Sequence, residues 1–405
     1  MIQIYLFLLF FEGIFRKWFR LSSLDFFYIL RDAIIFLAIF LSLARNRLPL
    51  SVSVKCINLF FVALIFFAGI QSLFIPNPSA VYILGLRNYF SPLLLIYYLL
   101  ITKSLGKFHE ILFRWTPSLI FLETILCILQ ALAPRSSFLN LTTTGSEAMV
   151  TSGLQVRPLG TFTSSLGFSY FLCFIYSYSL TVYRKWRIQK SIIIFSCIFL
   201  NIALSGTRTV PLNVLFISLM YFLFFERGGG KFRFLSFSIL TITSIFLLVS
   251  NTILKQVWSA FQVRLKYQTE GSTGTLTRIF DPVLGIRIED LSFLGSGIGK
   301  HHASAFPYLG SSSWIEIESF RWIAELGIIG LLLYLGRFLI PLIAITGSIL
   351  KGNFDERFFM LSGLIPFLIF GGVTTQPTVQ GFSGLFICCA ITYKLESNTR
   401  LTNHE

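Results

Sequence analysis

The sequence predicts an all-α integral membrane protein with about twelve transmembrane helices. Of its 405 residues, 55% are hydrophobic and 13% are charged, and the mean hydropathy is +0.76. Soluble domains carry about 25% charged residues, so this chain cannot cover a water-facing surface. Its apolar residues also fall in runs of about twenty, the length that crosses a bilayer as a helix. We therefore expect residues 1–405 to form a single integral membrane domain.

Runs of this length predict where the spans lie. They fall near residues 1–15, 27–44, 54–74, 80–101, 111–133, 166–184, 188–205, 209–226, 233–251, 318–349, 355–372 and 378–394. The first run is short and the tenth is long, so either could be tilted, broken or differently bounded. The first run has no basic region before it and no small-residue cleavage site, which indicates a retained helix or half-helix and not a signal peptide.

Lysine and arginine in the short connectors predict the orientation, because cytoplasmic loops are enriched in both. Every second connector carries them: Arg45, Arg47 and Lys55; Lys103, Lys107 and Arg114; Arg184, Lys185, Arg187 and Lys190; Arg227, Lys231 and Arg233; Lys351 and Arg357. The connectors 71–79 and 372–377 carry neither. Both termini are therefore expected in the cytoplasm, and the long loops 134–165 and 252–317 outside.

Basic residues also occur on the side predicted to be outside. Arg16, Lys17 and Arg20 follow the first span, the long outer loops are basic, and the formal net charge of the chain is +15. Outward cations beside a membrane suit a polyanionic or phosphate-bearing lipid substrate. The alternative is that they contact anionic lipid headgroups.

Several charged residues fall in or near the spans: Glu12, Arg31, Asp32, Arg87 and Glu123. An ionised side chain in hydrocarbon costs at least a few kcal/mol unless it faces a partner or a cavity. Two interpretations of Arg87 stay open. It forms an ion pair with Glu12 or Asp32 that locks helices together, or it is a cation that lines an outward-facing pocket.

Two arginines are expected at fixed places on the outer side. Arg157 precedes Pro158 and Gly160 in the segment RPLGTF, and Arg208 lies in the short turn LSGTRTVPL. Glycine and proline in these segments predict tight turns. Each arginine could be a lone interfacial residue, but two in glycine-containing turns on one face favour a shared role.

The long outer loop is expected to begin with a helix lying at the membrane interface, near residues 253–266. Its apolar residues share one helical face; the alternative is a continuation of the ninth span. A turn-rich region with a GSGIG element follows. A lone Gly-x-Gly-x-Gly outside a strand–turn–helix unit does not predict a dinucleotide site.

Four segments together resemble the O-antigen ligase and polymerase family of bacterial membrane enzymes of surface-polysaccharide assembly. They are RPLGTF, LSGTRT, FLGSGIG and EIESFRWIAELGIIGLLLYL; EGIFRKWF and RNYFSP resemble one branch of it. The resemblance implies an all-helical, membrane glycosyltransferase-like fold. It implies glycosyl transfer at the outer face of the inner membrane from a polyprenyl-pyrophosphate-linked glycan, without nucleotide sugar, metal or other cofactor. Membrane lipid, a flippase and a chain-length regulator are the partners it implies.

Carried onto this chain, the resemblance singles out Arg157, Arg208, Glu325 and Gly327. One departure matters. Ligases that attach glycan to lipid A core commonly have a histidine nine residues before the matching glutamate, and Glu316 stands there in this chain. The departure favours a polymerase of O-antigen or exopolysaccharide over a ligase, which stays the alternative.

The chemistry of such a transfer sets two requirements. Charge on the leaving pyrophosphate needs stabilising, which arginine suits because its guanidinium stays ionised and matches phosphate oxygens. The acceptor hydroxyl must lose a proton to a carboxylate or neutral imidazole. Candidate cations are Arg157, Arg208, Arg264, Arg278, Arg287 and Arg321, with Arg87 near the outer end of its span. Candidate bases are first Glu316 and Glu318, then His301 and His302.

Simpler interpretations of these bases stay open. Carboxylates near a helix start interact favourably with the helix dipole, and adjacent histidines could be a solvated loop pair.

Two adjacent histidines and scattered carboxylates lack metal-ligand spacing, and dispersed basic residues argue against nucleic-acid binding. The six cysteines lie in or beside apolar runs, so we expect no disulfide framework. A lipid-linked oligosaccharide flippase is the alternative of another class, although the chain shows no internal repeat.

Overall fold

The computed structural model describes residues 1–19, 26–45, 52–141, 156–207, 209–225, 292–302, 305–310, 315, 318–350, 360–364 and 377–402. Its helices are α1 Ile2–Trp18, α2 Phe26–Arg45, α3 Val52–Phe74, α4 Ser79–Thr102, α5 Leu105–Leu132, α6 Ser165–Val182, α7 Ile188–Ser205, α8 Thr209–Met220, α12 Phe306–Leu309, α13 Glu318–Leu350 and α15 Pro377–Thr402. Short 3-10 turns span Phe138–Asn140 and Tyr183–Lys185, and a π-helical turn, Tyr221–Phe225, continues α8.

The predicted all-α class is confirmed in the part of the chain that the structure describes, and its helices are consistent with a membrane protein. Among the described residues, five helices are long and apolar enough to cross a membrane, namely α3 to α7. Their bounds lie within a few residues of the predicted spans, except that α5 begins earlier, at Leu105. The predicted span 233–251, most of 355–372 and the interfacial helix near 253–266 lie outside the described residues. The total of twelve spans therefore stays a prediction.

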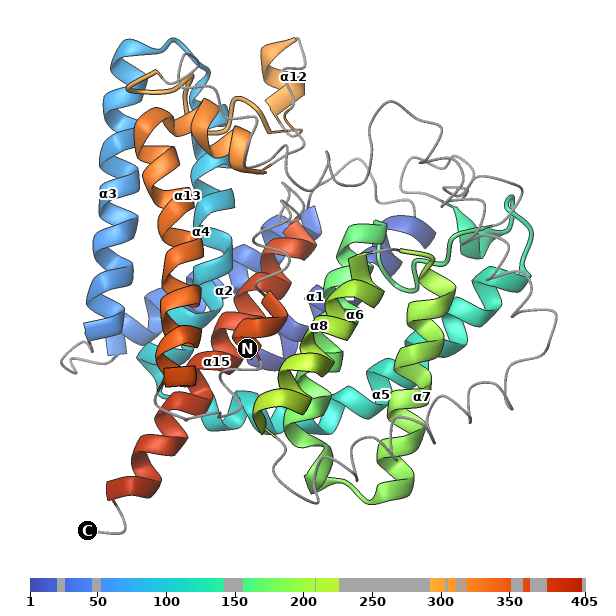
Figure 1. Ribbon diagram of the computed structural model, residues 1–405. Coiled ribbons are helices and arrows are strands. Elements are labelled where there is room, and N and C mark those ends of the chain that lie inside the picture. Colours follow the sequence, from blue (N-terminus) through green and yellow to red (C-terminus); the bar gives the residue numbers. More distant parts are fainter. Residues whose placement is uncertain are drawn as a thin grey trace.

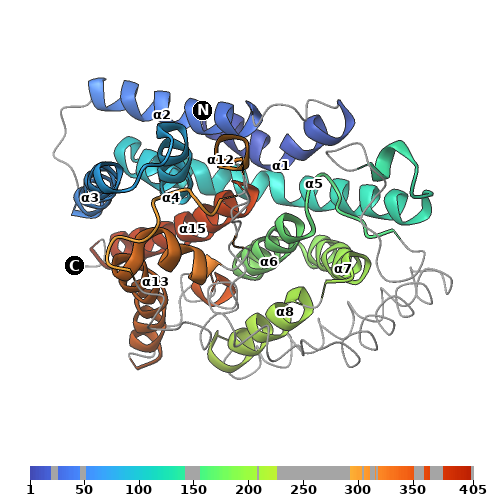
Figure 2. The same ribbon diagram turned by 90° about the horizontal axis from the view of Figure 1, so that it is seen from above.

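Helices α4, α15 and α6 form the centre of the bundle. Helix α15 lies between α4 and α6 and packs against both, while α2 and α3 pack on α4 and α7 and α8 pack on α6 (Figures 1 and 2). Phenylalanines fill the space between α6 and α15: Phe171 and Phe174 of α6 contact Phe382 of α15 at ring-centroid distances of 5.9 and 6.1 Å. These contacts hold the two buried helices together through dispersion and burial.

Helix α6 is buried on nearly all sides although its sequence contains many serines and tyrosines. The hydroxyls of Ser169 and Ser177 donate to the carbonyls of Ser165 and Cys173, one turn earlier in the same helix. The small, internally satisfied serines allow close approach of neighbouring helices. Position 363 illustrates this, because a Cβ on Gly363 would lie 2.4 Å from Ser177 Oγ.

The buried charged residues that the structure describes lie toward one end of the bundle, which we call the polar end. It contains the C-terminal ends of α1, α3, α5 and α7 and the N-terminal ends of α2, α4, α13 and α15. Hydrogen bonds cross between these ends, for example from Asn77 in the α3–α4 connector to the Ser296 carbonyl at 2.9 Å. The polar end coincides with the side that the positive-inside pattern predicts to face outward.

Candidate functional site

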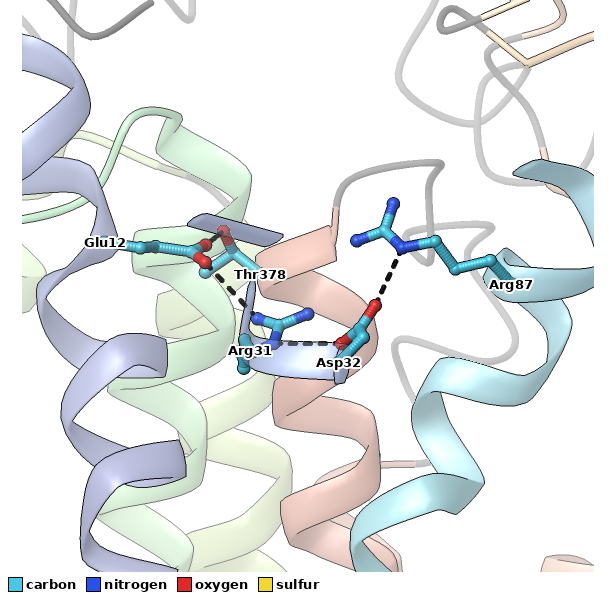
Figure 3. Close-up of polar contacts among 5 residues, drawn as sticks. All are labelled: Glu12, Arg31, Asp32, Arg87 and Thr378. Carbon is cyan, nitrogen blue, oxygen red and sulfur yellow. Dashed lines mark hydrogen bonds and ion pairs between the residues drawn. The ribbon is translucent and has the colours of Figure 1, made fainter. Parts of the chain in front are cut away.

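A chain of four charged residues crosses the polar end between α1, α2 and α4 (Figure 3). The Arg31 guanidinium donates to Glu12 Oε2 at 3.4 Å and to Asp32 Oδ1 at 3.3 Å. The Arg87 Nε atom donates to Asp32 Oδ2 at 2.8 Å, and the Thr378 hydroxyl of α15 donates to Glu12. The predicted ion pair between Arg87 and Asp32 is therefore present. We call these five residues the arginine network.

Burial differs along the arginine network. The side chains of Arg31 and Glu12 are 0% and 2% exposed, whereas that of Arg87 is 19% exposed. Two acids and two bases balance one another, which permits the inner charges to stay in a buried environment. The inner part of the network therefore fastens α1, α2 and α15 together, and the outer part holds Arg87 in place.

Arg87 keeps donors beyond its ion pair. Figure 3 shows that one of its two Nη atoms points away from Asp32 and the other to the side. In the described part of the chain, the buried Nη2 atom has no hydrogen-bond acceptor. A guanidinium fixed through Nε, with its Nη edge turned away, is suited to bind an anionic oxygen. The structural and functional interpretations of Arg87 are thus compatible.

The second polar cluster joins a glycine-rich loop, residues 292–302, to α13. The Glu325 carboxylate accepts hydrogen bonds from the backbone N–H groups of Gly299 and His301 at 2.9 and 3.1 Å, and from the Tyr89 hydroxyl at 3.1 Å. Gln71 of α3 donates to the carbonyls of Leu294 and Glu325 and accepts from the Ile298 N–H. These bonds fix the path of the loop.

Helix α13 is broken at Gly327, whose φ of 63° and ψ of −138° are not helical. The loop bonds to the backbone groups that the break releases: Ser296 N–H donates to Ala324 O at 2.7 Å, and Ile328 N–H donates to Ser292 O at 3.2 Å. A Cβ on Gly327 would lie 2.2 Å from Ser292 O. A break is one of the three possibilities that the sequence leaves open for the long tenth span, and its positive φ explains why glycine occupies this position.

The two adjacent histidines occupy different environments. His301 is half-buried, and its Nε2 atom lies 2.8 Å from Ser296 Oγ, whose hydroxyl also hydrogen-bonds the Ala324 carbonyl. His302 is 8% exposed. The two histidines are therefore not a solvated loop pair, and His301 is the more exposed of the two. Its imidazole is held by Ser296, which in turn is held by the broken helix.

The third polar cluster fixes the RPLGTF segment against α1 and α5. Gln130 accepts from the N–H groups of Leu159 and Gly160, both at 2.9 Å, and Glu123 accepts from the Thr161 N–H at 3.0 Å and from its hydroxyl. Lys17 donates to the carbonyls of Gly160 and Phe162 at 2.9 and 3.0 Å. The buried Lys17 therefore serves this turn and not a ligand.

Arg157 connects this turn to the next motif. Its Nε atom donates to the Ser205 carbonyl, at the end of α7, at 3.0 Å. Gly206, with a φ of 56°, ends α7 immediately afterwards. The segments RPLGTF and LSGTRT are thus in direct contact. Arg208, the other arginine of the expected shared role, lies outside the described residues.

Of the remaining predicted site residues, the structure describes two and does not describe the others. Arg321 lies in α13 with 4% exposure, beside Trp322, whose ring packs edge-on against Tyr89 at 5.0 Å. Glu318 is the first residue of α13. Glu316, Arg208, Arg264, Arg278 and Arg287 lie outside the described residues. The structure therefore brings Arg87, Arg157, His301 and Arg321 to the polar end in three separate clusters.

Sequence reasoning missed the uncharged polar residues Gln71, Asn77, Gln130, Thr161 and Thr378. The available signal was an amide or hydroxyl inside or beside an apolar run. Within the described ranges, no group of three or more His, Cys, Asp or Glu could hold a metal ion. The six cysteines, all described, are free thiols.

Comparison of the chain with protein-family models, with curated proteins and with solved structures finds no match.

Proposed function

We propose that the protein polymerises polyprenyl-pyrophosphate-linked oligosaccharide repeat units, of O-antigen or exopolysaccharide, at the outer face of the bacterial inner membrane. The observation that carries the proposal is the pairing of the four segments on which the family resemblance rests. RPLGTF contacts LSGTRT through Arg157, and FLGSGIG contacts the α13 segment through Glu325. Segments far apart in sequence thus meet at one end of the bundle.

The reaction would transfer a glycan from its lipid carrier to a sugar hydroxyl. The anomeric carbon–oxygen bond breaks, and its electron pair leaves with the polyprenyl pyrophosphate. The acceptor oxygen forms the new glycosidic bond, and its proton passes to a base of the protein. A fixed cation stabilises the charge that develops on the pyrophosphate. Arg87 has the most suitable geometry among the described arginines, because Asp32 fixes its orientation and leaves its Nη edge available.

The roles of the acidic and imidazole groups follow from their contacts. Glu325 accepts three hydrogen bonds and is 1% exposed, so we assign it to positioning the glycine-rich loop and not to proton transfer. His301 is half-buried and oriented by Ser296, so it is the described candidate for the base. Glu316 and Glu318 remain the other candidates. The mechanism needs no metal.

The topology belongs to the same proposal. Both termini lie in the cytoplasm, about twelve helices cross the membrane, and the loops 134–165 and 252–317 lie outside. The polar end then faces the compartment where lipid-linked repeat units accumulate after translocation. A flippase that delivers these units and a chain-length regulator are the partners that this arrangement implies.

A lipid-linked oligosaccharide flippase is the second candidate, and two observations favour it. Discontinuous helices and charges buried inside the bundle are typical of transporter binding sites. Helix α13 is broken at Gly327, and Arg31 is completely buried. Most of the buried charges nevertheless lie toward one end of their helices, as Arg31 and Asp32 do in the second turn of α2, although Glu12 lies near the middle of α1. This placement favours the enzyme.

Deletion in a host that depends on the protein separates the two functions. Loss of a polymerase leaves single lipid-linked repeat units in the outer leaflet, where an externally added glycosidase or lectin reaches them. Loss of a flippase leaves the same units in the inner leaflet, protected from both reagents. Retention of full-length glycan after deletion would contradict both proposals.

A further inference from the structure

A groove between α5 and α7 runs from the start of α7, at the opposite end of the bundle from the polar end, to the middle of both helices. Its volume is about 460 Å³, within the usual range for small-molecule sites, about 300–1,000 Å³. Its wall is formed mostly by apolar side chains, among them Pro117, Phe121 and Ile193. Phe121 and Ile193 are 57% and 59% exposed in the part of the chain that the structure describes. An apolar groove with such a rim fits a hydrocarbon chain.

Cations stand at one end of this groove. Arg187 and Lys190, at the start of α7, both line it. The Lys190 ammonium lies 5.8 Å from the centre of the Trp186 ring, which stacks on Phe113 at 5.8 Å, so the lysine is held beside the groove. Among the described residues, neither cation forms a salt bridge with a carboxylate. The two positive charges are therefore available to an anion.

We propose that this groove binds one anionic glycerophospholipid, with an acyl chain along the apolar wall and the phosphate at Arg187 and Lys190. Basic pockets between membrane helices on the cytoplasmic side are suited to anionic headgroups. The predicted orientation places the connector before α7 on that side, where anionic lipid is available. The proposal does not depend on the proposed reaction, because none of the residues that line the groove belongs to the three polar clusters.

The test measures lipid binding to the purified full-length protein after delipidation in detergent. Native mass spectrometry follows titration with phosphatidylglycerol and, separately, phosphatidylcholine. We expect one phosphatidylglycerol to bind more tightly than phosphatidylcholine. The double variant R187A/K190A should weaken phosphatidylglycerol binding about twenty-fivefold, since each cation beside an anionic headgroup contributes roughly a factor of five. Phosphatidylcholine binding should change much less.

Two controls keep the test specific. The double variant K55A/K107A removes the same charge from exposed positions on the same predicted side, outside the groove, and should bind phosphatidylglycerol as the wild type does. Ile193→Trp fills the groove while keeping both cations, and should also weaken binding; Val62→Trp, at an exposed apolar position on α3, should not. Equal losses in both charge variants, or normal binding in Ile193→Trp, would overturn the proposal.

Discussion

The Glu325 carboxylate accepts a hydrogen bond from the Gly299 N–H at 2.9 Å, across 26 positions of sequence. The same carboxylate accepts from the His301 N–H and the Tyr89 hydroxyl. One buried side chain thus joins α13, the glycine-rich loop and α4. It thereby fixes the backbone of the loop at His301, whose imidazole is held by Ser296.

Replacing Glu325 should release the glycine-rich loop. Glu325→Gln keeps the size of the side chain but turns an NH₂ group toward donors, and hydrogen bonds to a charged group contribute about 1.5–3 kcal/mol each. We expect destabilisation of about 2–4 kcal/mol and shorter glycan chains. Thermal unfolding of the purified protein and glycan electrophoresis measure the two effects. Glu110→Gln, in an exposed ion pair, should change neither.

Gly327→Ala tests the break in α13. The φ of 63° disfavours any residue with a Cβ, and that atom would lie 2.2 Å from the Ser292 carbonyl oxygen. We expect a loss of at least about 1–3 kcal/mol from backbone strain alone, and much lower yield of folded protein. Gly347→Ala, on the same helix, has no atom within 4 Å of the added Cβ and is the matched control. Equal yields of the two variants would contradict the described break.

Arg31→Met should destabilise the protein by about 3–5 kcal/mol, because Glu12 then remains buried without its cation. Adding Glu12→Gln should recover part of this loss, since it removes the stranded charge. The coupling between the two changes should be about 1–3 kcal/mol, as for residues in one network. Chemical unfolding of the wild type, both single variants and the double variant measures it. Simple additivity would mean that the two side chains do not interact.

Arg87 variants separate support from catalysis. Arg87→Lys keeps a positive charge beside Asp32 but loses the guanidinium fork, so we expect near-normal thermal stability and a tenfold or greater loss of polymerising rate, about 1.4 kcal/mol or more of transition-state stabilisation. Arg87→Ala should lose both stability and activity, because Asp32 then loses its outer partner. Rates with lipid-linked repeat units and melting temperatures check this. Arg114→Ala, an exposed arginine at the opposite end of the bundle, is the control.

Much of the helical framework could be predicted from the sequence, because crossing a bilayer requires long apolar runs. Helix α7, Ile188–Ser205, has the predicted bounds, and α4 differs by one residue at each end. The predicted start of α5 lies further along the chain than the observed start at Leu105, because the polar residues Lys107, His109 and Glu110 interrupt the apolar run. Polar residues at a membrane surface can continue a helix beyond its apolar part.

The site could be predicted only in part. The pair Asp32 and Arg87 was one of two open interpretations, since buried charges need partners. The other members of the arginine network could not be identified from the sequence, because Thr378 lies 366 positions from Glu12 and no local pattern specifies their contact. Gln71 is similar: it contacts the Glu325 carbonyl across 254 positions. Tertiary packing selects such partners, and single-sequence patterns do not encode it.

The proposed function depends most directly on chain growth in a purified system. The protein, reconstituted in liposomes with a polyprenyl-pyrophosphate-linked repeat unit, should produce a ladder of lengthening glycans and release polyprenyl pyrophosphate, with a chelator present. The Arg87→Lys variant should shorten the ladder, and Arg114→Ala should not. A lipid-linked unit that crosses the bilayer without lengthening would contradict polymerisation and identify a flippase.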